Sequence, residues 1–230
     1  MAMVRSGIVG VALALLTSGV NAAIDSDQTA ISAAQAADMI IAVVVKGDEA
    51  SVRPLSIYWK DSNGQPLDFS DAPYVGDSLT KALTHNLLRH FSSDDEPDHA
   101  RKEQAVATFA HAVASAVRRS ACHTTGGTVT PYAEPHLGAS ATVTYECLVP
   151  DAAKVILPLD FPNDSSITVG QLIQEATALD AAPAEKRISA TMKLQTTADG
   201  KTWGSPAMGG VLATVLDGIA GALAPGSKRP

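Results

Sequence analysis

Histidine and carboxylate residues are the side chains of this sequence that could bind a metal ion or move a proton. His85 and His90 are five residues apart, about 140° around a helix, whereas two zinc ligands on one helix need a spacing of three or four. The run Asp94-Asp95-Glu96-Pro97-Asp98-His99 gathers oxygen and nitrogen ligands that could hold a metal. The same acidic run also suits a solvated helix start, because negative charge is favoured at the positive end of the helix dipole. A metal-dependent enzyme is therefore one alternative for this chain.

A second candidate for chemistry is the serine in Gly76-Asp77-Ser78-Leu79. These four residues resemble the nucleophile block of the GDSL family of serine esterases. The resemblance implies Ser78 as the nucleophile, its amide in the oxyanion hole, and an α/β sheet. The family also has a Gly-x-Asn-Asp block and a late Asp-x-x-His whose histidine accepts the serine proton. Here Phe161-Pro162-Asn163-Asp164 lacks the glycine and no histidine follows His136. Ser78 is equally suited to cap a helix.

Charge and motif content narrow the classes of function. The net charge of −7 offers no basic surface for phosphates, which argues against a nucleic-acid partner. The sequence has no Cys-x-x-Cys, His-Glu-x-x-His, glycine-rich phosphate loop or Gly-x-Ser-x-Gly motif. The absence of a complete catalytic set favours a non-enzymatic interaction or ligand-binding protein without a cofactor. An exported hydrolase using Ser78 or the acidic cluster is the alternative.

The N-terminal 22 residues have the pattern of a secretory signal peptide. Arg5 precedes an apolar or small run from residue 7 to residue 20, and Val20-Asn21-Ala22 places small side chains where a signal peptidase reads them. Cleavage is predicted between Ala22 and Ala23. The apolar run is shorter than the roughly 20 residues that span a bilayer. We expect a periplasmic or secreted protein with no membrane span after signal removal.

Two cysteines flank two β-favouring runs. Cys122 precedes residues 126–130, Cys147 follows residues 141–145, and a loop rich in proline and glycine separates the runs. If the runs pair as a hairpin in symmetric register, the two cysteines lie opposite each other. Export favours their oxidation. We therefore predict a structural disulfide that stabilises the fold by roughly 3 kcal/mol, with two buried free thiols as the alternative.

The remaining pattern predicts an α+β fold, with a mainly antiparallel sheet built from hairpins, an antiparallel helix pair and a C-terminal helix. Residues 23–230 are predicted to form one domain, with a weak split near residue 150 as the alternative. An Asn63-Gly64 turn and an Asp199-Gly200 turn each favour a hairpin, with Leu67 and Phe69 on the strand after the first and Trp203 packing over the second. Strands are predicted, in addition to the cysteine hairpin, at 39–45, 52–60, 154–161 and 187–195. Helices are predicted from Asp77 or Ser78 to Phe91, from the acidic run to Arg118-Arg119, and at 169–179 and 208–223.

The predicted C-terminal helix is the candidate partner-binding element. It carries one charge, Asp217, and clusters small residues that would allow close approach of another helix. An amphipathic stripe of this kind normally packs on the chain's own core, which is the alternative. The stripe consists of Val211, Leu212, Val215, Leu216, Ile219 and Leu223.

Overall fold

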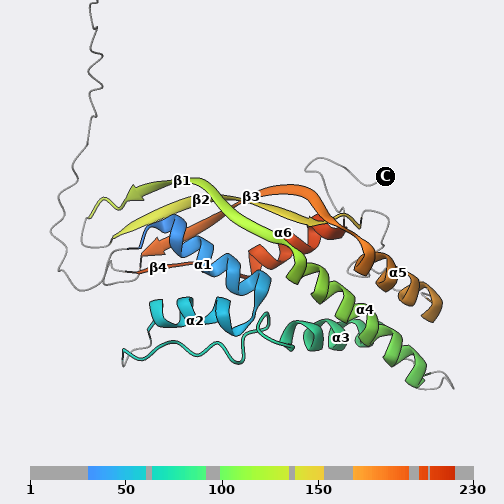
Figure 1. The fold of residues 1–230 in the computed structure, drawn as a ribbon. Coiled ribbons are helices and arrows are strands. Elements are labelled where there is room, and N and C mark those ends of the chain that lie inside the picture. Colours follow the sequence, from blue (N-terminus) through green and yellow to red (C-terminus); the bar gives the residue numbers. More distant parts are fainter. Residues whose placement is uncertain are drawn as a thin grey trace, which may run out of the picture.

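The computed structural model describes residues 31–60, 64–91, 99–134, 138–152, 168–196, 202–206 and 208–220. Within these ranges the chain forms six helices and one four-stranded antiparallel sheet, which confirms the predicted α+β class (Figure 1). The predicted signal peptide and the strand predicted at 154–161 lie outside the described residues. The helices are α1 (Ala33–Lys46), α2 (Glu49–Tyr58), α3 (Ser78–Phe91), α4 (His99–Arg119), α5 (Val169–Ala181) and α6 (Met208–Ala220). The strands are β1 (Ala121–Pro131), β2 (Ala139–Pro150), β3 (Ala184–Thr196) and β4 (Trp203–Gly204).

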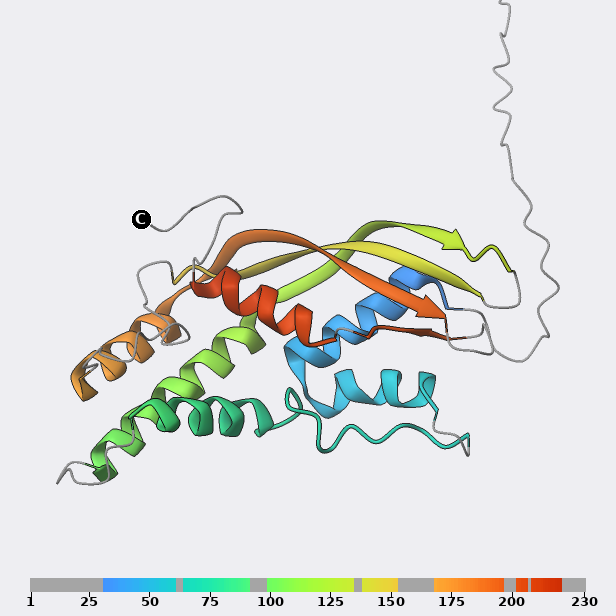
Figure 2. The ribbon, with the colours of Figure 1, turned by 180° about the vertical axis from the view of Figure 1, so that it is seen from behind.

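The sheet has one covered face and one open face. Its strand order is β1-β2-β3-β4, and the described helices lie on the same side of it (Figure 2). Side chains alternate accordingly, since every second residue of a strand points to the same face. In β2 the covered set is Ala141, Val143, Tyr145, Cys147 and Val149, all of which are buried. The alternation predicted for residues 187–195 is confirmed in β3. Met192 and Leu194 are buried and Ile188 and Ala190 are partly buried, whereas the alternate residues Arg187, Ser189, Thr191, Lys193 and Gln195 are exposed.

The apolar run at 39–45 is not the predicted strand, because it belongs to helix α1. Ser32 caps the helix, accepting the Gln35 amide N–H, while the Gln35 side chain accepts the Ser32 amide N–H. Gly47 ends the helix in the left-handed conformation. The helix is buried around most of its circumference between the sheet, α2 and α6, so its core residues form an unbroken run that mimics a buried strand.

The strand predicted at 52–60 is also wrong, since residues 49–58 form helix α2. Asp48 supplies the cap by accepting the Ser51 amide N–H at 2.8 Å. The returning strand expected at Leu67 and Phe69 reduces to one isolated bridge between Lys60 and Pro66. The helical spacing of Val52, Leu55 and Trp59 was the competing signal in this segment.

Helices α3 and α4 form the predicted pair. Leu79, Leu83 and Leu87 of α3 are buried at four-residue spacing. Helix α4 runs back from His99 to Arg119 and passes beneath the sheet (Figure 1). Its predicted stripe is buried: Val106, Phe109, Ala110, Val113 and Val117.

The cysteine hairpin is confirmed. Strands β1 and β2 pair in antiparallel register with Cys122 directly opposite Cys147, and the two residues form a disulfide. The register shifts once between Thr124 and Gly126, which marks a β-bulge. The bond joins residues 25 apart in the sequence across neighbouring strands.

Breaking this disulfide with the double substitution Cys122→Ser and Cys147→Ser should lower the free energy of unfolding by about 3 kcal/mol, because the open chain gains loop entropy. Urea unfolding followed by circular dichroism measures the change. The double variant without reductant should match the wild type with reductant. A midpoint equal to that of the oxidised wild type would contradict this expectation.

Arg118 joins the end of α1 to the segment that leads into α3. Its guanidinium donates to the carbonyl of Val45 at 3.1 Å and to that of Val44 at 3.5 Å, where an α-helix leaves its last carbonyls unpaired. It also donates to the carbonyls of Tyr74 at 2.6 Å and Gly76 at 3.3 Å. The side chain is half-buried; its burial lowers the pKa of Arg118, and the nearby Asp48 carboxylate opposes that shift. One cation therefore holds two backbone segments together.

Candidate functional site

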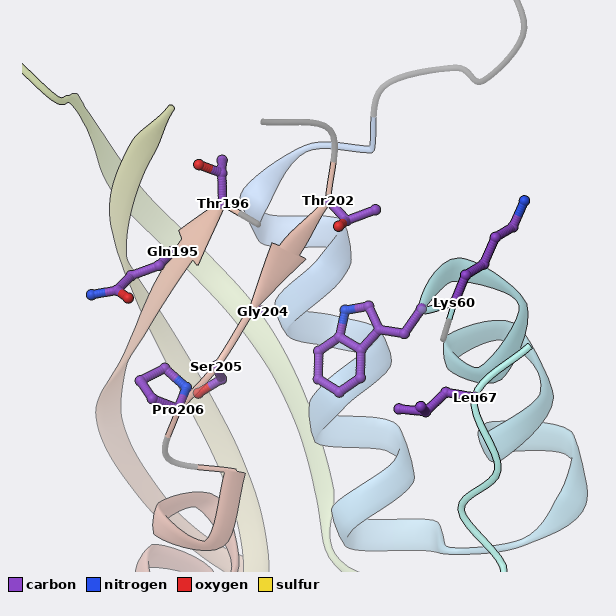
Figure 3. A pocket seen from close by; sticks show the side chains of 9 residues that line it. Lys60, Leu67, Gln195, Thr196, Thr202, Gly204, Ser205 and Pro206 are labelled. Atoms are coloured by element: carbon purple, nitrogen blue, oxygen red, sulfur yellow. The ribbon is translucent and has the colours of Figure 1, made fainter. Parts of the chain in front are cut away.

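An open cleft lies between the end of α2 and the short strand β4. Its volume is ≈ 410 Å³. Leu67 lies across the cleft from Gly204 of β4 (Figure 3). The indole of Trp59 lines the same cleft and gives it an aromatic wall. The lining residues are Trp59, Lys60, Leu67, Gln195, Thr196, Thr202, Gly204, Ser205 and Pro206.

Hydrogen bonds to β4 fix the indole of Trp59. Its Nε1–H donates to the carbonyl of Trp203 at 2.7 Å, and the Trp203 amide N–H donates to the hydroxyl of Tyr58 at 2.7 Å. The Phe69 ring supports it, with ring centroids 5.9 Å apart and planes tilted by 34°. Because the indole edge is tied to the backbone, the ring cannot swing aside without breaking a hydrogen bond. The aromatic wall is therefore preorganised.

The polar part of the cleft consists of neutral groups and one cation. Hydroxyl groups come from Thr196, Thr202 and Ser205. The Thr196 hydroxyl also accepts the Ala139 amide N–H at 3.0 Å, which holds its position. Lys60 is the charged residue in the lining, and its side chain extends at the rim, away from Leu67 and Gly204 (Figure 3). The cleft combines an apolar wall with groups that can both donate and accept hydrogen bonds.

A second hollow of ≈ 560 Å³ adjoins the first across Leu67 and is acidic. Asp48, Glu49 and Asp68 are among its lining residues. The amide N–H of Ser51 lowers the pKa of Asp48, and that of Ser70, at 2.8 Å, lowers the pKa of Asp68. Each carboxylate thus has a structural role: Asp48 caps helix α2 and Asp68 stabilises a turn. Within the described ranges, no group of three His, Cys, Asp or Glu residues could hold a metal ion.

The structure places Ser78 and His99, two residues suggested for hydrolysis, at the starts of helices α3 and α4. Ser78 is the first residue of α3, and its amide N–H donates to the Val75 carbonyl at 3.1 Å. The sheet is antiparallel, which contradicts the α/β sheet that the esterase resemblance implies. His99 lies at the start of α4 beside Glu103, with 3.2 Å between Nε2 and Oε1, and both side chains are exposed. The rest of the acidic cluster, residues 94–98, is outside the described residues.

The stripe predicted to bind a partner lies against the chain's own core. Val211, Val215 and Ile219 are buried, and Leu212 and Leu216 are partly buried beside them. Helix α6 contacts α1, α4, β2 and β3. Its Gly218 carbonyl accepts the Lys186 ammonium at 2.8 Å. Leu223 is outside the described residues. In this arrangement the stripe is covered by the protein itself.

Glu175 on α5 is the described acidic group whose environment most disfavours its charge. Its Oε2 atom is buried and has no hydrogen-bond partner among the described residues. Burial raises the pKa of Glu175 above its ordinary value. The stabilising contribution of protonated Glu175 is therefore fully present at pH values below the pKa that this side chain has in the unfolded chain. It is lost as the pH rises through the raised pKa of the folded chain.

Glu175→Gln should consequently be more stable than the wild type at pH 7 and equally stable at pH 3.5, because an amide never becomes charged. Thermal unfolding at a series of pH values measures this difference. Glu185→Gln is the matched control, since Glu185 is exposed at the start of β3. If the wild type were more stable than Glu175→Gln at pH 7, the buried carboxylate would have a favourable partner.

No known protein family, no curated protein and no solved structure matches this chain. Among the described residues no helix has the length and hydrophobicity needed to cross a bilayer.

The cleft residues were not recognised as a site from the sequence. Trp59 was assigned to a strand, so its position beside β4 could not be inferred. The predicted Asp199-Gly200 hairpin turn lies outside the described residues; on either side of it, Thr196 pairs with Trp203 in the sheet. The available signal was the rarity of tryptophan: the chain has two, and they meet here.

Proposed function

We propose that this chain is a non-enzymatic ligand-binding protein of the periplasm or extracellular space and that the Trp59 cleft is its binding site. The observation that carries the proposal is the indole wall, fixed by the Trp203 carbonyl and facing a volume of ≈ 410 Å³. An apolar surface with a few placed polar groups is the usual composition of a small-molecule site. Export is supported by the signal-like residues 1–22 and, weakly, by the disulfide.

The lining favours a polyhydroxylated ligand with a flat apolar face, which is the chemistry of a saccharide. The C–H face of a sugar ring can stack on the indole, while its hydroxyl groups exchange hydrogen bonds with serine and threonine. Lys60 at the rim would favour a neutral or anionic sugar over a cationic one. Because the stripe of α6 is covered by the core, we assign the binding role to this cleft and not to that helix.

The test uses the oxidised protein and two probe sets, neutral disaccharides and the corresponding uronate-containing disaccharides. Saturation-transfer NMR detects binding and titration gives the dissociation constants. Trp59→Phe should weaken both sets, because a smaller ring keeps part of the wall but loses the hydrogen bond to Trp203. Lys60→Ala should weaken the uronate set alone, by about threefold to tenfold, as expected for one exposed charge pair.

Ile57→Ala is the control for these variants. Ile57 is an exposed apolar residue of α2 that is not part of the cleft lining, so its removal should leave the affinities unchanged. Binding that is lost in Ile57→Ala but kept in Trp59→Phe would move the site elsewhere. Absence of binding for both probe sets in the folded protein would overturn the assignment of a saccharide ligand.

A further inference from the structure

Among the described residues, strand β1 has no pairing strand along one long edge of the sheet. It lies at the end of the strand order and pairs with β2 on one side only (Figure 2). Near its start the other side is capped, because Asp38 of α1 accepts both the amide N–H of Thr124 at 2.8 Å and its hydroxyl at 3.0 Å. After the bulge, residues 126–131 are exposed, and none of the described residues pairs with their outer edge. Side-chain capping therefore stops where the regular strand begins.

The main-chain groups on this open edge can be identified from the hairpin. The Tyr132 amide N–H donates to the Gly138 carbonyl at 3.0 Å, next to the pair Pro131 and Ala139. Since hydrogen-bonded and non-bonded pairs alternate along an antiparallel ladder, Gly127 and Val129 direct their N–H and C=O groups away from β2. Proteins normally protect such an edge with charge or with a covering segment.

Charge protection is absent here. Residues 124–133 contain no Asp, Glu, Lys, Arg or His, although the chain as a whole carries a net charge of −7. Residues 138–144 of the neighbouring strand are also uncharged. Two copies of an acidic protein repel each other over most of their surfaces, but not where both are neutral. Val129, a residue that is 55% exposed, adds an apolar group at the same place.

We infer that the open edge of β1 binds a second copy of this chain, so that two sheets join into one across a two-fold axis. Antiparallel pairing centred on Thr128 places Gly127 of one copy opposite Val129 of the other. The two residues then exchange their outward N–H and C=O groups. Gly126 and Gly127 have no side-chain carbon, which leaves room for close approach of the second strand. Self-pairing needs no further partner, because each copy supplies the same neutral edge.

Sedimentation velocity of the oxidised full chain over a range of concentrations tests this inference. The wild type should convert to a species of twice the mass as concentration rises. Val129→Lys places two like charges at the centre of the interface and should raise the dissociation constant about fivefold or more. Thr191→Lys is the matched control: it adds the same charge at an exposed position of β3, two strands from the edge, and should leave the dimer intact.

Hydrogen exchange at the amides of Gly127 and Val129 provides a second readout, since protection should increase with protein concentration. A wild type that stays monomeric at every concentration would overturn the inference, and so would a dimer that Val129→Lys leaves unchanged. Slow exchange at these two amides in a monomer would also overturn it, because the edge would then be covered within one chain. Loss of dimer in Thr191→Lys would place the interface elsewhere.

Discussion

Gly47→Ala should lower the free energy of unfolding by about 3 kcal/mol or more, through left-handed strain and overpacking together. Gly47 ends α1 with φ 60°, a conformation that costs an L-residue stability. A Cβ at this position would also collide with the Tyr74 carbonyl oxygen and the Arg118 guanidinium. Neither neighbour can give way freely, because the two are hydrogen-bonded to each other. Urea or thermal unfolding measures the loss.

Gly76→Ala is the matched control for this substitution. Gly76 also has a positive φ, 54°, but an added Cβ would meet no atom within 4 Å. Its cost should therefore be limited to backbone strain, about 1–2 kcal/mol. The difference between the two variants isolates the close approach of Arg118. Equal losses would mean that the segment around Tyr74 moves aside without penalty.

Arg118→Met should destabilise the fold by about 3 kcal/mol, because it leaves carbonyl groups of two segments without their charged donor. Methionine retains much of the apolar stem, so the change reports mainly on the four hydrogen bonds to Val44, Val45, Tyr74 and Gly76. Arg118→Lys should recover only part of the loss, since one ammonium lacks the fork that reaches both segments. Chemical unfolding of the three proteins measures the series.

Arg53→Met controls for the change in net charge. Arg53 is an exposed residue of α2, and its substitution should alter the free energy of unfolding by no more than about 0.5 kcal/mol. If Arg53→Met were as damaging as Arg118→Met, the effect would come from global charge. If Arg118→Met left stability unchanged, water would be an adequate partner for these carbonyls.

The parts of the fold that were predictable from sequence are those with a single clear period. Leu79, Leu83 and Leu87 repeat every four residues, and β3 alternates strictly, so both elements were assigned correctly. The cysteine pair followed from register and an inferred oxidising compartment. Each of these segments has one apolar and one polar face. Periodicity is informative when solvent contacts one face of the element.

Helix α1 shows why the rest was not predictable from hydrophobicity alone. Ile40, Ile41, Val43, Val44 and Val45 are all buried, so no polar residue reveals the helical period. The decisive signals were local: Ser32 and Gln35 form a capping box and Gly47 a C-cap. The Trp59 cleft depended on that assignment. The cleft lies between the end of α2, which the sequence pattern predicts to be a strand, and β4. No local sequence pattern predicts that these two elements are adjacent.

The packing of α6 on α1 constrains the order in which the molecule can be assembled. These are the first and last helices of the described residues; they contact each other, and Val211 and Val215 of α6 are buried. During synthesis α6 follows α1 by roughly 10 s or more, since ribosomes add about 5–20 residues per second. Until then part of the underside of the sheet stays exposed to water. The native core is therefore completed late. A chain that crossed a membrane gradually would be unable to complete its core until residues 208–220 had also crossed.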